Sequence, residues 1–213
     1  MKDYQTLAKD YDFLFPEEEV FKQKSFFKKI IKKYSIKSCL DCACGTGSHL
    51  LLLHHLGLKC YGSDLSPEML TFARKKLKDL KIPLHQTDFR NLSTAWKDKF
   101  DLIICMTTSF PHMLNDEDAV SALKSMYDRL NNNGILIIDN GFSDFFLDFQ
   151  PKLIPARITS DRAFYFFMEY PEINKVIYNI LEVKKRDKSF SHLFESISNN
   201  AMRKTDLERY FSR

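Results

Sequence analysis

No apolar run in this sequence approaches the roughly 20 residues that a membrane-spanning helix needs. The opening stretch, MKDYQTLAKDYDFLF, also lacks the apolar segment of a secretory signal peptide. We therefore expect a cytoplasmic protein without a membrane partner.

The sequence lacks the even, well-spaced cysteine set of a secreted disulfide scaffold. Its 5 cysteines are odd in number, and Cys39, Cys42 and Cys44 are crowded together. A closed zinc site usually needs four ligands in two pairs, and no second cysteine pair follows downstream. We therefore expect reduced cysteines and no metal site.

A strong excess of charge is also missing. The 32 Lys and Arg residues against 28 Asp and Glu residues give a formal net charge of +4, which is too mild to indicate a nucleic-acid-binding protein. A predicted helix over residues 17–34 carries the lysine-rich stretch KQKSFFKKIIKKYSIK. This pattern is typical of the solvated face of an amphipathic helix, and the alternative is an RNA-binding patch.

Short apolar runs alternate with helical patterns between residues 36 and 140, which predicts an α/β fold with a Rossmann-like parallel sheet and helices on both faces. Ser66-Pro67 has the pattern of a helix N-cap followed by the first helical position. The predicted strands are Lys37–Asp41, Lys59–Ser63, Leu84–Thr87, Asp101–Met106 and Ile135–Asp139.

After Asn140 the pattern changes to consecutive β-rich segments, which predict an antiparallel β segment. Thr205 to Glu208, TDLE, then reads as a capping box that opens a last helix. We predict one domain. Its parts are residues 1–35 (an N-terminal lid and helix), 36–140 (a cofactor-binding core), 141–203 (the antiparallel segment on the substrate side) and 204–213 (a truncated last helix).

The stretch CLDCACGTGSHLLLL, residues 39–53, has the pattern of a strand, a tight turn and a helix. Asp41 ends the strand, Ala43, Gly45 and Gly47 keep the turn free of bulk, and the following helix begins with unpaired backbone N–H groups. Such a turn forms a cradle for a dinucleotide or for S-adenosylmethionine.

The dinucleotide fingerprint G-x-G-x-x-G needs a third glycine, and the sequence has Leu50 or Ser48 at that position. Asp41 is suited instead to a cofactor that carries an ammonium group. Asp64, at the end of the second strand, fits the ribose diol of either cofactor class, and the alternative is a turn residue. Asp88 and Phe89, after the third strand, are suited to adenine, and the alternative for Asp88 is a loop-capping aspartate.

Five segments in this order, LDCACGTG, GSDLSPEML, QTDFRNL, FDLIICMTTSFPHM and LNNNGILIIDN, resemble the motifs of class I S-adenosylmethionine-dependent methyltransferases. The resemblance implies that the glycine turn holds the methionine end of the cofactor. It also implies that Met106 lies beside the cofactor. The cofactor-binding residues that it implies are Asp41, Ala43, Cys44, Gly45, Gly47, Asp64, Leu65, Asp88, Phe89 and Met106.

Within that class, YDFLFP, DCACGTG and SFPHM are most similar to the glycine and sarcosine N-methyltransferase group. Thr108 stands where that group carries an asparagine. Gly141 stands where it carries the arginine that grips the substrate carboxylate, which argues against glycine as the acceptor. His112 is the candidate general base, with a structural loop histidine as the alternative, and Tyr11 is a candidate contact to cofactor or substrate.

The segment IIDN, Asp139-Asn140, is similar to the metal-binding pair of catechol-type methyltransferases, but CMTTS lacks the further carboxylate, so we predict no magnesium site. The resemblance implies S-adenosylmethionine-dependent methylation of a small molecule, at nitrogen, with S-adenosylhomocysteine as product. An RNA- or protein-directed methyltransferase and a non-catalytic binding module are the alternatives.

The class usually finishes its sheet with an antiparallel hairpin, which is missing here after the fifth strand. An apolar fifth strand at an open edge would expose backbone groups that invite association. We therefore expect a truncated form, or an edge covered by a second chain in a homo-oligomer or by the antiparallel segment Ala156–Ser198.

Overall fold

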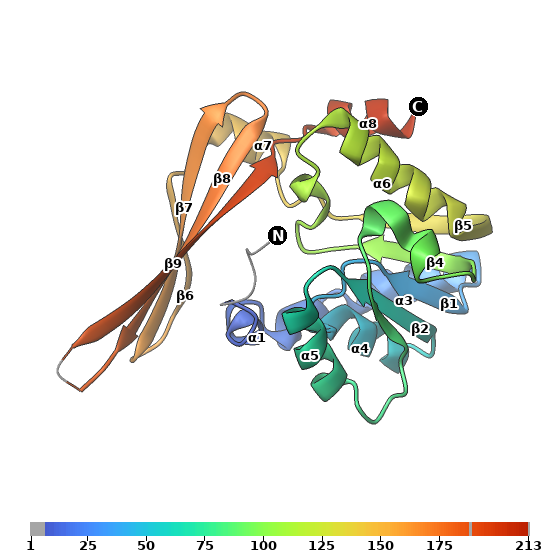
Figure 1. Ribbon diagram of the computed structural model, residues 1–213, viewed down its shortest axis with the longest axis horizontal. Helices are drawn as coiled ribbons and strands as arrows, with labels where there is room; N and C mark the ends of the chain where they lie inside the picture. The colour runs from blue at the N-terminus through green and yellow to red at the C-terminus, as the bar shows by residue number, and fades with distance from the viewer. Residues whose placement is uncertain (1–6, 188, 213) are drawn as a thin grey trace. The chain divides into compact units, whose positions relative to one another are not determined.

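The computed structural model describes residues 7–187 and 189–212, which form two compact units. The first unit contains the residues up to 110 together with 117–139. The second contains residues 111–116 and the chain from residue 140 onward. Each unit has a β-sheet of its own (Figure 1).

The sheet of the first unit has five parallel strands in the order β3-β2-β1-β4-β5. This order confirms the predicted Rossmann-like parallel sheet, in which two strands on either side of a central strand are reached by helical crossovers. The strands are β1 (Ser38–Asp41), β2 (Lys59–Asp64), β3 (Leu84–Gln86), β4 (Phe100–Cys105) and β5 (Leu130–Ile138).

Strand β5 differs from its predicted bounds. It begins at Leu130, which pairs with Phe100, and the register then shifts so that Ile135 pairs with Leu102. Asn133, inside the irregular part, has a left-handed backbone with φ of 64°. The bulge separates two paired stretches of one strand, and the sequence pattern predicted only the second stretch.

The helices of the first unit lie on both faces of its sheet, with α4 and α6 on opposite sides (Figure 1). The predicted helix over residues 17–34 is wrong in one respect, because it is divided at Lys22–Gln23. The amide of Gln23 bonds to the carbonyl of Val20, three residues back, which ends α2 before α3 begins. The α-helices up to residue 128 are α1 (Tyr11–Leu14), α2 (Glu17–Phe21), α3 (Lys24–Tyr34), α4 (Ser48–His55), α5 (Pro67–Lys76) and α6 (Asp116–Asp128). Two short 3-10 helices are η1 (Phe89–Thr94) and η2 (Phe110–His112).

Helix α4 packs closely on β2 because Gly62 has no side chain. Leu50, which occupies the position of the third fingerprint glycine, is fully buried. A Cβ added at Gly62 would lie 2.5 Å from Leu50 Cδ1 and 2.7 Å from Leu84 Cδ2. The close approach of helix and sheet, which a glycine on the helix provides in dinucleotide-binding proteins, is provided here by a glycine on the neighbouring strand.

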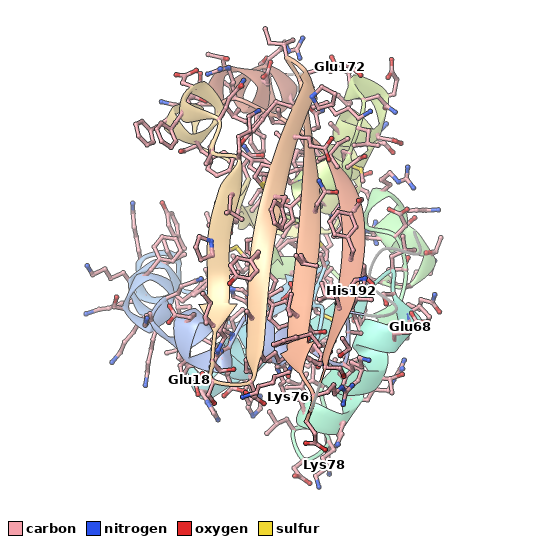
Figure 2. All side chains as sticks on the ribbon, turned by 90° about the vertical axis from the view of Figure 1, so that its left-hand side faces the viewer. Glu18, Glu68, Lys76, Lys78, Glu172 and His192 are labelled. Carbon is pink, nitrogen blue, oxygen red and sulfur yellow. The ribbon has the colours of Figure 1, made fainter. Side chains whose placement is uncertain are left out.

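The second unit contains an antiparallel sheet in the order β6-β7-β8-β9, which confirms the predicted antiparallel segment. Figure 2 looks onto its four strands. One face carries buried side chains such as Phe164, Met168 and Ile197, while Phe194 on the other face is 55% exposed. The elements are α7 (Asp144–Phe149), β6 (Leu153–Ile158), β7 (Arg162–Glu172), β8 (Lys175–Lys185), β9 (Phe190–Asn200) and α8 (Lys204–Phe211).

Polar contacts join residues 111–116 of this unit to its last segments. Asn200 Nδ2 donates to the Met113 carbonyl over 3.0 Å, and the Tyr210 hydroxyl donates to Asp116 Oδ1 over 2.7 Å. Glu182 is 3% exposed and forms ion pairs with Arg162 and with Lys184. The charge of this buried carboxylate is therefore compensated by two cations.

One expectation for the end of the chain needs correction. Helix α8 begins at Lys204, not at Thr205, because Asp206 accepts from the Arg203 amide and makes Arg203 the N-cap. The antiparallel segment forms a sheet of its own, so it adds no strand to β5, which is a terminal strand of the described parallel sheet. Residues of β5 are half-buried or exposed instead of buried on both faces.

The close contact at Gly62 predicts a coupled pair of substitutions. Gly62→Ala should lower the free energy of unfolding by about 1–3 kcal/mol through overpacking, and Leu50→Ala by about 2–5 kcal/mol through a cavity. Because the new methyl group occupies part of that cavity, the double variant should lose less than the sum of the two. Urea unfolding of the four proteins checks this, and additive losses would contradict the contact.

Candidate functional site

The turn between β1 and α4 is held by backbone hydrogen bonds to the neighbouring strands. The Cys42 amide bonds to the Ile104 carbonyl of β4, and the Cys44 amide bonds to the Ser63 carbonyl of β2. Cys42 and Cys44 are buried, whereas Ala43 and Gly45 are half-buried. The turn therefore presents Ala43 and Gly45 at the carboxyl edge of the sheet.

Both glycines of the turn have left-handed backbones, with φ of 52° at Gly45 and 91° at Gly47. Such conformations disfavour residues that carry a Cβ atom. A Cβ at Gly47 would also lie 2.8 Å from Leu77 Cδ1, at the end of α5. Gly47 thus allows α5 to approach the beginning of α4.

Asp64, at the end of β2, ties the turn to the next helix. Its Oδ2 accepts from the Gly45 amide and its Oδ1 from the Ser66 amide, each over 2.8 Å. Burial raises the pKa of Asp64, and the hydrogen bonds from backbone amides oppose that rise. A carboxylate offers about four acceptor positions, so Asp64 keeps capacity for a further donor beside the backbone amides.

Asp41 is 1% exposed at the end of β1, with its Oδ1 3.3 Å from the Ala43 amide. Burial raises its pKa to about 8, and the charge of Asp64 adds to the rise. Asp41 is therefore largely protonated at neutral pH. A cationic group beside it would favour the ionised form.

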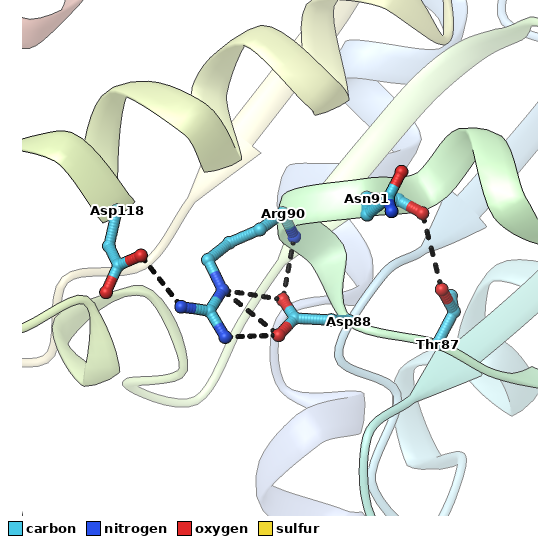
Figure 3. A network of polar contacts seen from close by, with 5 residues as sticks. All are labelled: Thr87, Asp88, Arg90, Asn91 and Asp118. Atoms are coloured by element: carbon cyan, nitrogen blue, oxygen red, sulfur yellow. Dashed lines mark hydrogen bonds and ion pairs between the residues drawn. The ribbon is translucent and has the colours of Figure 1, made fainter.

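Asp88 caps the 3-10 helix η1 by accepting from the Arg90 amide over 2.8 Å. The Arg90 guanidinium also contacts both oxygens of Asp88 and donates to Asp118 Oδ1 over 2.7 Å (Figure 3). Burial opposes the ionisation of Asp88, but the bonds from Arg90 outweigh it and lower the pKa. Asp88 therefore acts as a cap of the loop helix. Phe89, the next residue, is half-buried.

The loop after β4 contains two consecutive left-handed residues, Thr107 with φ of 58° and Thr108 with φ of 60°. Threonine is β-branched, and this conformation costs such residues roughly 1–2 kcal/mol each. Thr108 stands where the resembling group carries asparagine, which tolerates this conformation better. Met106, just before the pair, is 9% exposed.

The first unit contains all ten predicted cofactor-binding residues and Tyr11, whereas His112 belongs to the second unit. Leu65 follows Asp64, is half-buried, and its carbonyl accepts from Gln86 Nε2 over 3.1 Å. Tyr11 lies at the turn, since one of its ring carbons is 3.9 Å from the place of a Gly45 Cβ. The roles of these residues remain predictions.

Lys76 is a residue of this region that the sequence pattern did not indicate. Its Nζ donates to Asp12 Oδ1 over 2.9 Å, to Thr46 Oγ1 over 3.2 Å and to Ser48 Oγ over 2.7 Å. A lysine in the last turn of a surface helix is usually solvated, so its contact with Thr46 depends on how α5 packs. The sequence contained one signal for Asp12, because it lies in the motif YDFLFP, which the resemblance assigns to the same group of proteins as the turn motif GTG.

Within residues 7–187 and 189–212, no group of three or more His, Cys, Asp or Glu side chains could hold a metal ion. In the same described part, no helix is long and apolar enough to cross a membrane. All five cysteines are free and buried.

Residues 39–134 match a protein family described as a methyltransferase domain. A glycine/sarcosine N-methyltransferase of Parasynechococcus marenigrum is 35% identical over 125 residues, which cover 58% of this chain and 44% of that protein. A dTDP-3-amino-3,4,6-trideoxy-alpha-D-glucopyranose N,N-dimethyltransferase of Streptomyces venezuelae is 34% identical over 102 residues, 48% of this chain and 41% of that protein. The chain thus spans less than half the length of these curated relatives.

Among solved structures, an S-adenosylmethionine-dependent methyltransferase from Clostridium acetobutylicum superposes with a TM-score of 0.81 at 24% identity, over 98% of this chain and 86% of that one. An amino pentose methyltransferase from Micromonospora echinaspora, solved with bound S-adenosylmethionine, gives 0.80 at 16% identity, over 95% and 86%. These likenesses confirm the predicted fold, and the sequence relatives confirm the predicted resemblance.

The buried position of Asp41 predicts how stability changes with pH. With a folded pKa of about 8 against 3.8 for the usual carboxyl, the folded protein holds a proton that the unfolded chain has lost, so stability falls as pH rises through this window. Between pH 6.5 and 8 the loss should be about 1.5 kcal/mol. Asp41→Asn, which resembles the protonated acid, should abolish this loss, while the exposed Asp98→Asn should retain it.

Urea unfolding at several pH values between 6.5 and 8.5 checks this prediction. Burial lowers the pKa of His49 from 6.5 to about 4, so this residue changes stability mainly between those two pH values, and it is present in both proteins that are compared. Equal pH slopes for wild type and Asp41→Asn would contradict a buried, protonated Asp41.

Proposed function

We propose that the protein binds S-adenosylmethionine and transfers its methyl group to a small molecule, at nitrogen, because residues 39–134 match the methyltransferase domain family. The observation that carries the proposal is the cradle at the carboxyl edge of the parallel sheet, where Asp41, Ala43, Gly45 and Asp64 come together. The named relatives are N-methyltransferases of glycine, sarcosine or amino sugars, which supports a small nitrogen acceptor.

The residues present fit this cofactor. Asp64 keeps acceptor capacity beyond its bonds to backbone amides, which suits a ribose hydroxyl donor. Asp41 offers a buried carboxyl group that becomes a carboxylate partner when a cationic ammonium group lies beside it. Leu50 in place of a third glycine removes the fingerprint of pyrophosphate binding.

S-adenosylmethionine supplies a methyl group on a positively charged sulfur, with a neutral leaving group. The protein's own task is to align an unprotonated nucleophile about 3 Å from that carbon and to exclude water. No nucleophilic side chain is required. His112 is the proposed general base, since an amine acceptor is protonated near neutral pH and must lose its proton first.

We assign the other proposed roles to the residues that the sequence motifs indicate. Cys44 and Gly47 form the turn, Leu65 lies beside the ribose, and Phe89 with Asp88 and Met106 contacts the adenosine. Because Asp88 already accepts from Arg90, its remaining capacity for adenine is small. Phe89 and Met106 are therefore the stronger candidates for that part of the cofactor.

We also propose a cytoplasmic location, which the five free thiols support. A homo-oligomer and the absence of a nucleic-acid partner stay predictions from the open edge of β5 and from the mild charge.

Methyl-labelled S-adenosylmethionine tests the function directly. Incubated with separate pools of small metabolites, RNA and protein, the enzyme should label the metabolite pool, with nitrogen as the methylated atom by mass spectrometry. Label in RNA or protein would favour the macromolecule-directed alternatives. Binding without any label transfer would indicate a non-catalytic module, and tighter binding of NAD than of S-adenosylhomocysteine would reject the cofactor itself.

Asp64 provides the sharper test of the site. Asp64→Ala should weaken S-adenosylhomocysteine binding by about 1.5–3 kcal/mol, the scale of hydrogen bonds to a charged group. Ser66→Ala is the matched control, because it removes the helix cap to the Met69 amide and leaves the carboxylate in place. Isothermal titration calorimetry measures both, and an unchanged dissociation constant for Asp64→Ala would reduce Asp64 to a turn residue.

A further inference from the structure

The N-terminal helix α1 lies against the glycine turn of the first unit. A ring carbon of Tyr11 is 3.9 Å from the place of a Gly45 Cβ, and the Tyr11 ring packs on Phe15 with centroids 4.9 Å apart. A side chain at Gly45 would therefore contact Tyr11. The Tyr11 ring lies beside Gly45, whose amide donates to Asp64.

The Lys76 ammonium group bonds to Asp12 of α1 beside the turn. The three N–H donors of Lys76 are matched by three oxygens, those of Asp12, Thr46 and Ser48. The Thr46 hydroxyl in turn donates to Asp12 Oδ1 over 2.5 Å. Thr46 is 2% exposed, and the Lys76 side chain is 15% exposed.

The arrangement is asymmetric. Lys76, Thr46 and Ser48 are anchored in α5 and at the beginning of α4, whereas Asp12 comes from α1 and its side chain is 46% exposed. The pair can therefore open at the Asp12 side while the other partners stay in place. Partial exposure keeps such an ion pair weak enough to break and re-form.

We propose that Asp12 and Lys76 form a latch that holds Tyr11 over the glycine turn and thereby sets how fast the cofactor enters and leaves. The inference rests on the proposed function, since it concerns the same cradle. In this role Asp12 and Lys76 are positioning residues, which act through Tyr11.

The latch predicts a change in exchange kinetics. Asp12→Asn keeps an oxygen acceptor but removes the charge, and it should speed S-adenosylhomocysteine dissociation about tenfold, because affinity changes in one complex arise mostly in the dissociation rate. Tyr11→Ala should have a similar effect with the latch intact. Surface plasmon resonance on the full chain measures these rates.

Glu19→Gln is the matched control. It breaks the exposed ion pair between Glu19 and Lys22 in the same N-terminal region and should leave dissociation unchanged. A purely structural role of Asp12 would lower the melting temperature without changing the rate. That result, or an unchanged rate in Tyr11→Ala, would overturn the proposal.

Hydrogen exchange separates this inference from the proposed function. In the ligand-free protein, the amides of residues 10–15 should exchange at least several-fold faster in Asp12→Asn than in wild type and Glu19→Gln. If wild type fails to bind S-adenosylhomocysteine, the proposed function fails, while this comparison still decides the latch. Equal exchange in all three proteins would reject the latch itself.

Discussion

The hydrogen bond from the Gly45 amide to Asp64 is the interaction on which the candidate site depends. It joins the turn after β1 to the end of β2, and the other oxygen of Asp64 holds the Ser66 amide at the beginning of α5. One carboxylate therefore sets the distance between two helix beginnings. Without this carboxylate, the turn before α4 and the beginning of α5 would no longer be hydrogen-bonded to the same residue at the carboxyl edge of the sheet.

Burying two carboxyl groups at that edge has an energetic cost that the fold tolerates. Burial raises the pKa of Asp41 and of Asp64, so both are less stable as carboxylates in the ligand-free protein. Strained residues Thr107 and Thr108 lie in the loop after β4. Carboxyl groups with shifted pKa values and loops with strained backbones are common at ligand-binding sites, which is consistent with the proposed cofactor site.

The sequence predicted well where the pattern is local. Alternating apolar runs located the parallel strands, and Ser66-Pro67 located the beginning of α5, where Ser66 accepts from the Met69 amide. The errors lie where a few polar contacts decide the outcome. Asp206 moves the beginning of α8, a three-residue hydrogen bond at Gln23 divides the first long helix, and the bulge in β5 depends on its pairing with Phe100.

The order of the elements, the glycine turn and the carboxyl groups at the ends of β1 and β2 can be predicted from the amino-acid pattern, because they follow from short-range periodicity and from steric rules. Which distant side chains meet can be seen only in the folded chain. Leu50 packs over Gly62, Arg90 joins Asp88 to Asp118, and Lys76 joins Asp12 to Thr46, since each contact links elements brought together by packing. Such contacts depend on how the helices approach the sheet, which no local pattern encodes.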